Sequence, residues 1–361
     1  MVAAFVLAGA CGGKAEVDAR GDGAAGTGAG GAGAGGTAGG DAAADAKPEV
    51  GPEVGDVVPK TDASSADGGD AGGAPTSTLG AVHCPPASGA YPNPLATSVT
   101  PAQVPITPPG GIMFLEGPVW LADRGVLLLS EWNGGHRILQ LTPPAAVEVF
   151  LPASRTNGLA LAPESGALLI ITESPGAGVA RLNLADKSVT PLVQAYEGQP
   201  FVQPNDLAVR ADGTIYFTDY QAGRLYRRAP DGGLTIVSSL AKSNGVALSP
   251  DERTLYLNAD TRTVKYPVAA DGTVGAGTDL TTGLRGADGL AIDCAGNVYV
   301  AQNDGGAVAV VSAAGTKLGE IGGLPRAVTN AAFGGPTKRT LYITTSSALY
   351  AAELPVPGLP Y

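Results

Sequence analysis

A six-fold internal repeat constrains the fold of this chain more than any other feature. The copies begin at residues 115, 156, 204, 243, 287 and 329, and they read LEGPVW, TNGLAL, PNDLAV, SNGVAL, ADGLAI and TNAAFG. The second residues of successive copies are separated by 41, 48, 39, 44 and 42 positions. A period near 40 is typical of repeat architectures whose unit is a four-stranded sheet, so the repeat decides the fold class.

Each copy has the pattern of a β-hairpin. A short apolar strand leads into a turn such as ADG, SPDER or CAGN, and a second strand such as TIYFT or TLYIT follows. Turn residues of these types accept positive φ, and β-branched and aromatic residues suit a pleated surface. One sheet cannot bury both its faces, whereas six sheets packed radially can. The sequence therefore predicts an all-β fold, a six-bladed β-propeller from about residue 95 to 358.

The last copy is too short to complete its own sheet. We expect an extended segment within 94–107 to supply the missing strand and close the ring. A pair of β-sandwiches is the alternative fold, but it would not explain the even spacing.

The part of the chain before the repeats has a different composition. Residues 12–80 are mostly Gly, Ala, Asp, Ser and Pro and carry eleven acids and four bases, so they hold most of the net charge of −11. Such a segment buries too little apolar surface to offset its ordering entropy, which predicts a disordered tether. No basic or aromatic cluster of the kind that binds nucleic acid occurs in the chain.

The first eleven residues, MVAAFVLAGAC, form a short apolar run that ends in a cysteine. The run is too short to span a bilayer and resembles the end of a bacterial lipoprotein signal, with Cys11 as the lipidated residue. No Lys or Arg precedes it, so a frayed N-terminus of a cytosolic protein is the alternative. We expect a signal remnant at 1–11, a linker at 12–80, and a propeller at 81–361 in a monomeric protein of the cell envelope or secreted from the cell.

The remaining cysteines are Cys84 and Cys294. An oxidising compartment would allow them to form a disulfide, and two unrelated thiols are the alternative.

The repeated second position carries the chemistry. In a propeller the first strand of each blade runs along the central channel, so equivalent residues converge on one axis. Here they are all oxygen donors, and two are acids, which repel each other unless a cation lies between them. Oxygen ligands without Cys or His favour a hard cation such as calcium. The alternative is that the repeated Asn-Gly pairs only fix the start of each strand. The six residues are Glu116, Asn157, Asn205, Asn244, Asp288 and Asn330.

The repeats, from LEGPVW to TNAAFGGPTKRTLYIT, resemble the senescence-marker-protein/gluconolactonase family of sugar-lactone hydrolases and related esterases over roughly 113–347. The resemblance implies a divalent metal, calcium foremost with zinc or magnesium as alternatives, held by Glu116, Asn244 and Asp288. It places Asn205 beside the metal as an outer ligand or substrate contact.

The resemblance also implies a reaction, the opening of a small lactone or related ester. The metal would polarise the carbonyl while Asp288 takes a proton from the attacking water. Gln203 stands where animal members carry an arginine, so a sugar-orienting charge is missing. We expect Asn157, Gln203 and Asn205 to contact the substrate.

Two other functions fit the same residues. The first is a cell-envelope propeller that binds a carbohydrate or a protein without turning it over. The second is a phosphotriesterase-like activity, because diisopropyl fluorophosphatase resembles the same plan.

Overall fold

The computed structural model describes Cys84 and residues 89–108, 110–112, 114–163, 166–172 and 177–360. Cys11 and the segments 1–11 and 12–80 lie outside the described residues. Every regular element among the described residues is a β-strand. This part of the chain contains no helix that is long and apolar enough to cross a lipid bilayer.

The described strands form six four-stranded antiparallel sheets and one two-stranded hairpin. We number the sheets as blades 1 to 6 in chain order. Blade 1 contains β2 (Leu115–Leu121), β3 (Val126–Glu131), β4 (Arg137–Thr142) and β5 (Ala146–Leu151). Blade 2 contains β6 (Thr156–Leu161), β7 (Ala167–Thr172), β8 (Gly178–Asn183) and β9 (Val189–Val193). The hairpin of β10 (Ala195–Tyr196) and β11 (Gln199–Pro200) follows blade 2.

Blades 3 to 5 repeat the same order. Blade 3 contains β12 (Pro204–Val209), β13 (Ile215–Asp219), β14 (Arg224–Arg228) and β15 (Leu234–Ser239). Blade 4 contains β16 (Ser243–Leu248), β17 (Thr254–Ala259), β18 (Arg262–Pro267) and β19 (Thr278–Thr282). Blade 5 contains β20 (Ala287–Ile292), β21 (Val298–Gln302), β22 (Ala307–Val311) and β23 (Lys317–Ile321).

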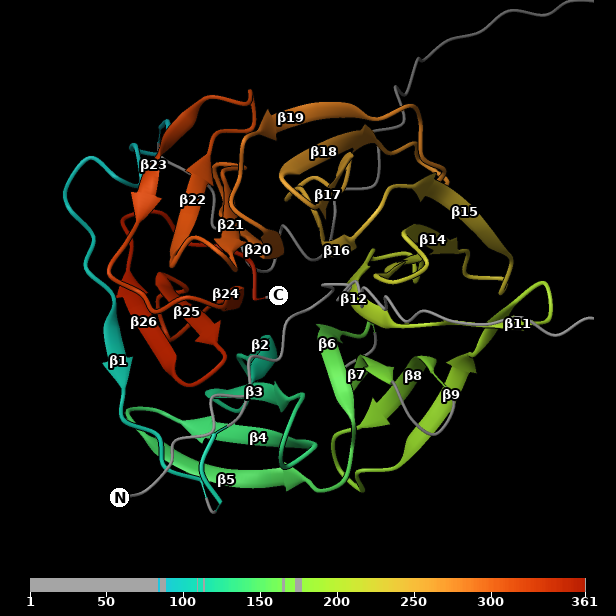
Figure 1. Ribbon diagram of the computed structural model, residues 1–361, viewed down its shortest axis with the longest axis horizontal. Coiled ribbons are helices and arrows are strands. Elements are labelled where there is room, and N and C mark those ends of the chain that lie inside the picture. Colours follow the sequence, from blue (N-terminus) through green and yellow to red (C-terminus); the bar gives the residue numbers. More distant parts are fainter. Residues whose placement is uncertain are drawn as a thin grey trace, which may run out of the picture. The chain divides into compact units, whose positions relative to one another are not determined.

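Blade 6 joins the two ends of the described chain. It contains β24 (Val328–Gly334), β25 (Thr340–Thr345), β26 (Leu349–Glu353) and, as its outermost strand, β1 (Ala102–Val104). The predicted closing strand within 94–107 is therefore confirmed, with Gln103 opposite Tyr350. The blades radiate from an axis along which the first strands lie innermost, and each inner strand contacts the next around the ring (Figure 1). The structure is the six-bladed β-propeller that the repeat predicts.

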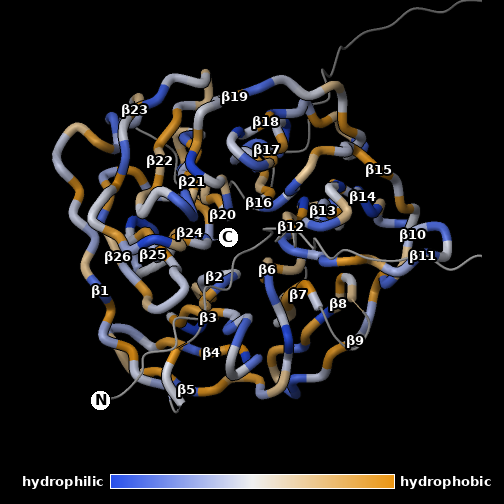
Figure 2. The backbone as a smooth tube through the Cα atoms, in the orientation of Figure 1, coloured by the Kyte–Doolittle hydropathy of each residue, from blue (hydrophilic) through white to orange (hydrophobic). Residues whose placement is uncertain are grey.

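The hydrophobic core is divided among the interfaces between blades. Each of six buried apolar clusters takes residues from two neighbouring blades: Leu128 of blade 1 belongs to one cluster with Leu168 of blade 2, for example. The cluster that closes the ring combines Leu115 of blade 1 with Tyr342 of blade 6. Orange, apolar stretches accordingly occur in all six sheets (Figure 2). Both faces of every sheet are covered by a neighbouring blade. A single blade would leave these apolar faces exposed to water.

The end of the channel at which the inner strands finish, called here the far end, is covered by residues 354–360. Three inner-strand ends bond to this segment: Leu359 donates its N–H to the carbonyl of Ile292 at 2.9 Å, Phe333 donates to Leu359 at 3.1 Å, and Trp120 donates to Pro360 at 3.0 Å. Figure 1 shows the C-terminus near the centre of the ring. The segment therefore links the inner strands of the neighbouring blades 5, 6 and 1 at the far end.

The two predicted cysteine partners also lie at the far end. Cys84 and Cys294 are joined with an S–S distance of 2.07 Å, and the N–H of Cys294 donates to the carbonyl of Pro357 at 2.8 Å. The disulfide ties the chain before blade 1 to the turn after β20, 210 positions away.

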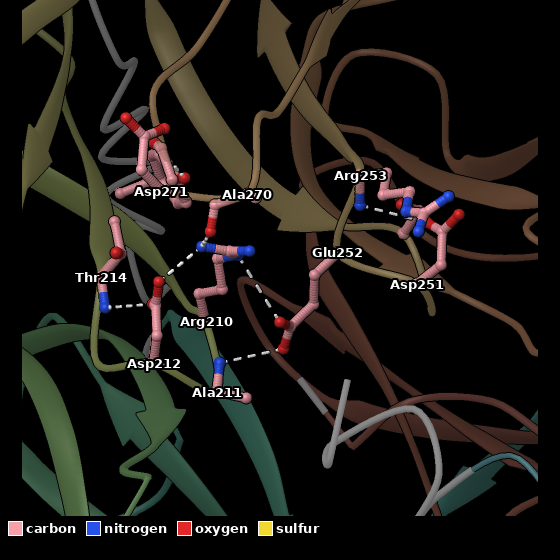
Figure 3. Close-up of polar contacts among 12 residues, drawn as sticks. Arg210, Ala211, Asp212, Thr214, Asp251, Glu252, Arg253, Ala270 and Asp271 are labelled. Atoms are coloured by element: carbon pink, nitrogen blue, oxygen red, sulfur yellow. Dashed lines mark hydrogen bonds and ion pairs between the residues drawn. The ribbon is translucent and has the colours of Figure 1, made fainter. Parts of the chain in front are cut away.

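A buried ion-pair cluster holds blade 3 against blade 4 (Figure 3). Arg210, just after β12, lies 3.7 Å through Nε from Glu252 Oε2 and donates through Nη1 to the carbonyl of Ala270 at 2.9 Å. Glu252 also accepts the N–H of Ala211 at 3.0 Å, and Asp212 pairs with the same guanidinium. Each buried charge has an opposite charge and a main-chain partner, as buried ionic groups require.

Candidate functional site

The six repeated oxygen donors lie at the start of the inner strands. Each is the second residue of its strand except Asn330, which is the third residue of β24. All six side chains are buried, with exposed fractions between 4% and 9%. This end of the channel is called here the site end.

A β-bulge accompanies the repeated position in every blade. The pairing between the first and second strands shifts register between Glu116 and Val119 in blade 1 and between Ala287 and Leu290 in blade 5, and blades 2, 3 and 4 shift at the equivalent place. In blade 6 the shift lies between Val328 and Asn330. A bulge inserts one extra residue and redirects the side chains beside it, a common device next to active sites. Most residues of each inner strand pack between blades. The bulge changes the direction of the side chains beside it, so that one polar side chain can point toward the axis.

Glycine after the repeated residue lets neighbouring inner strands approach closely. A Cβ on Gly289 would lie 2.0 Å from the Asn330 side chain, and a Cβ on Gly245 would lie 2.5 Å from the Asp288 carbonyl oxygen. No real Cβ tolerates such distances, so the N-G and D-G pairs of the repeat serve packing around the axis as well as turn formation.

Asp206 occupies this glycine position in blade 3, and the sequence analysis missed it. It is buried, and its carboxylate accepts the N–H of Leu207 at 2.9 Å and that of Val246, in blade 4, at 3.4 Å. A small cavity against Asp206 is lined by residues from all six inner strands, which places this carboxylate on the axis. The lining residues are Gly117, Pro118, Leu159, Asp206, Leu207, Val246, Leu290 and Asn330.

One feature of the sequence does indicate that Asp206 is a third axial acid. PNDLAV is the only copy in which an acid follows the repeated residue, where the other copies have Gly or Ala. An acid in the place of a close-packed glycine indicates that the side chain points into open space, and on this axis only the channel offers that space.

Burial raises the pKa of all three axial acids, and neighbouring negative charges add to the effect on Glu116 and Asp288. Burial, followed by the charges of Asp288 and Asp206, raises the pKa of Glu116 well above its usual value. Burial raises the pKa of Asp206 to about 7, against hydrogen bonds from Leu207, Val246 and Asn330. Burial also raises the pKa of Asp288 to about 7, although hydrogen bonds from Asn303 and Asn244 favour its charged form. Without a cation, burial and the neighbouring charges therefore favour the protonated forms of these carboxyls.

Amide side chains form hydrogen bonds with Asp288 and Glu116, two of the three axial acids. Asn303 donates to Asp288 Oδ2 at 2.8 Å, and Asn258 donates to the Asp288 carbonyl oxygen at 2.7 Å. Asn330 lies 3.5 Å from Glu116 Oε2. These contacts link blades 4 and 6 to the acids of blades 5 and 1.

The donor chemistry fits a hard divalent cation. The converging groups are carboxylate and amide oxygens, the ligands that calcium prefers, and a cation would offset the burial that raises the three pKa values and the repulsion that adds to it at Glu116 and Asp288. Among the described residues, no group of three or more His, Cys, Asp or Glu side chains is arranged to hold a metal ion.

The other predicted site residues lie in different places. Asn157 and Asn205 are buried at the level of Glu116 in blades 2 and 3. Gln203 is half-buried in the loop before β12. Cys84 and Cys294 are at the far end and take no part in the site.

Comparison with known proteins agrees with this geometry. The family model described as the SMP-30/Gluconolactonase/LRE-like region matches residues 114–347, which span all six inner strands. The chain belongs to this family. Within it, the chain is 28% identical over 279 residues to a gluconolactonase of Zymomonas mobilis, an alignment that covers 65% of this chain and 77% of that protein.

Two further relatives share the propeller region. The chain is 31% identical over 261 residues to a 6-deoxy-6-sulfogluconolactonase of Pseudomonas putida, covering 67% of this chain and 88% of that protein. The solved structure of a gluconolactonase of Xanthomonas campestris superposes with a TM-score of 0.63 at 26% identity, covering 75% of this chain and 99% of the other. The family and its fold are therefore those of lactone-opening hydrolases.

Proposed function

We propose that this protein is a metal-dependent lactonase that opens a small sugar lactone or a related carboxylic ester. The observation that carries the proposal is the meeting of three buried carboxylates and several amide oxygens on the axis of a propeller, in a chain whose relatives are lactonases. Burying like charges together lowers the stability of the folded protein, and acids with pKa values perturbed in this way are typical of functional sites.

The proposed metal ligands are Glu116, Asn244 and Asp288, with Asn205 beside them. Calcium suits this oxygen set best, and zinc or magnesium are alternatives. When bound, the ion would supply a positive charge that polarises the carbonyl of the ester.

Asp288 is the proposed general base. Its carboxylate can accept a proton from the attacking water, and Asn303, at 2.8 Å from Oδ2, orients it. In the metal-free protein burial raises its pKa to about 7, which favours the protonated form that cannot act as a base. The charge of a cation would lower that pKa and keep the carboxylate ionised.

The substrate would enter from the site end, because residues 354–360 bond to the inner strands of blades 1, 5 and 6 at the far end. Asn157 and Asn205 offer neutral hydrogen-bonding groups beside the acids, and Gln203 offers another at the mouth. This set suits the hydroxyl groups of an aldonolactone.

Hydrolysis measured in a pH-stat tests the proposal. We expect aldonolactone hydrolysis that a chelator abolishes and added Ca²⁺ restores, because the axial acids need a cation to act together. The panel should include aromatic lactones and aryl phosphotriesters. Turnover of the phosphotriesters alone would favour a phosphotriesterase, and saturable carbohydrate binding without any hydrolysis would favour the non-catalytic propeller.

We also propose that the protein works outside the cytoplasm as a lipid-anchored monomer, with Cys11 lipidated, residues 12–80 as the linker and 81–361 as the propeller. The Cys84–Cys294 disulfide supports an oxidising compartment. In a bacterial host, we expect metabolic labelling with a palmitate analogue to mark the full-length chain and to be lost in Cys11→Ala. Equal labelling of both would contradict the anchor.

A further inference from the structure

Asp219 is a buried acid at the site end that the proposed mechanism does not use. It is the last residue of β13 and has no exposed surface. Its Oδ2 accepts the N–H of Val202 at 2.7 Å, and its Oδ1 accepts the N–H of Gln203 at 2.9 Å and that of Ala222 at 3.1 Å. One carboxylate therefore joins the loop before β12 to the turn after β13.

The inner strand of blade 3 starts differently from those of blades 1, 2, 4 and 5. The residue two places before the axial residue has positive φ in blades 1, 2, 4 and 5, at Phe114 (59°), Arg155 (36°), Lys242 (58°) and Gly286 (68°). In blade 3 that residue is Gln203, and the proline after it favours an extended backbone. The N–H groups of residues 202 and 203 both donate to the Asp219 carboxylate at the end of β13.

The segment held in this way borders the site. Phe201 is buried edge-on against Phe217 and Tyr226, with ring centroids 5.2 Å apart in both pairs. Val202 is 61% exposed, and Gln203 leads directly into Pro204 and the axial residue Asn205. The buried Phe201 ring and the main-chain hydrogen bonds to Asp219 therefore restrict the movement of this loop.

We propose that Asp219 is a positioning residue that fixes the blade 3 side of the site. It holds the loop 201–203 so that Gln203 and Asn205 keep their places beside the axial acids. The expected kinetic effect rests on the proposed function. The hydrogen bonds from Val202 and Gln203 to Asp219, called here the clamp, are a property of the fold alone.

The matched substitution is Asp219→Asn, with Asp293→Asn as its control. Asp293 is equally buried and accepts the N–H groups of Ala295 and Asn297, both at 2.9 Å, but it lies at the far end beside the disulfide. Each substitution replaces one acceptor oxygen by an amide that cannot accept, so both should lower stability to a similar degree.

Hydrogen exchange tests the clamp without any substrate. Because Pro200 and Pro204 lack an N–H, the stretch between them reports through only the amides of residues 201, 202 and 203. We expect the amides of Val202 and Gln203 to exchange about tenfold faster or more in full-length Asp219→Asn, and to keep the wild-type rate in Asp293→Asn. Unchanged exchange in Asp219→Asn would overturn the proposal.

Kinetics and calcium titration then test the consequence. We expect kcat/KM for the hydrolysed lactone to fall about 10- to 100-fold in Asp219→Asn, mainly through KM, and to stay within about twofold in Asp293→Asn. A fall of equal size in both variants would assign Asp219 a role in stability only. If the wild type hydrolyses no lactone, the proposed function fails. The exchange rates and the Ca²⁺ affinity then still decide the inference. We expect the Ca²⁺ affinity to weaken in Asp219→Asn and not in Asp293→Asn.

Discussion

Replacing Asp288 by Asn is expected to lower lactone turnover by about a thousandfold or more while the propeller stays folded. Asparagine keeps an oxygen that can accept the hydrogen bond from Asn303, so the geometry of the site survives. It cannot accept a proton, and loss of a general base costs about 10²- to 10⁴-fold. The measurement is kcat in the presence of saturating Ca²⁺, together with thermal unfolding of the metal-free protein.

The stability of this variant separates catalysis from folding. Burial opposes the charged form of Asp288 in the metal-free protein, so Asp288→Asn should be at least as stable as the wild type at pH 8 without metal. Asp304→Asn is the matched control, because it removes one negative charge near Asp288 from an exposed position. Retained turnover in Asp288→Asn, or an equal loss in Asp304→Asn, would contradict the role given to Asp288.

The metal-free protein should become more stable as the pH falls from about 8 to about 5. The folded pKa values of Asp206 and Asp288 are about 7, above the ordinary value of 3.8, so the folded state binds more protons than the unfolded chain between these limits. Stability from these groups is then fully present below about pH 4 and is lost as the pH rises through 7. One pKa unit corresponds to about 1.4 kcal/mol, so the combined effect on the free energy of unfolding is on the order of several kcal/mol.

Calcium should weaken or reverse this dependence, since the ion binds the ionised acids and competes with their protons. Thermal unfolding of chelated and Ca²⁺-saturated protein at pH 5, 6, 7 and 8 measures both curves. Asp206→Asn should reduce the slope of the chelated curve. A chelated protein that gained stability toward pH 8 would show that the axial acids are not buried together.

The repeat was sufficient to predict the fold and the level of the site. Six copies near a 40-residue period predicted six blades, and the incomplete last copy predicted that a strand before Glu116 closes the ring, as β1 does. The same repeat identified the buried ring of oxygen donors, because residues at equivalent positions of equivalent strands must lie at one height in a radial assembly.

Asp206 and Asp219 were not predicted, for different reasons. Asp206 departs from the repeat by one position, and its importance depends on which way a bulged strand turns its side chain. Asp219 ends a strand that reads TIYFTD, and nothing in those letters shows that the carboxylate would face two N–H groups of a loop sixteen residues earlier.

The sequence alone therefore determined the features that repeat from blade to blade. These are the number of blades, the order of strands, and the six positions that face the axis. These follow from local hydrophobic patterns and turns that recur, and such patterns act over a few residues. Only the tertiary structure decided which acids lie close enough to change each other's pKa, which loop Asp219 holds, and that residues 354–360 cover the far end of the channel. Those contacts join segments distant in the chain, and their energies depend on distance and burial, which no local pattern encodes.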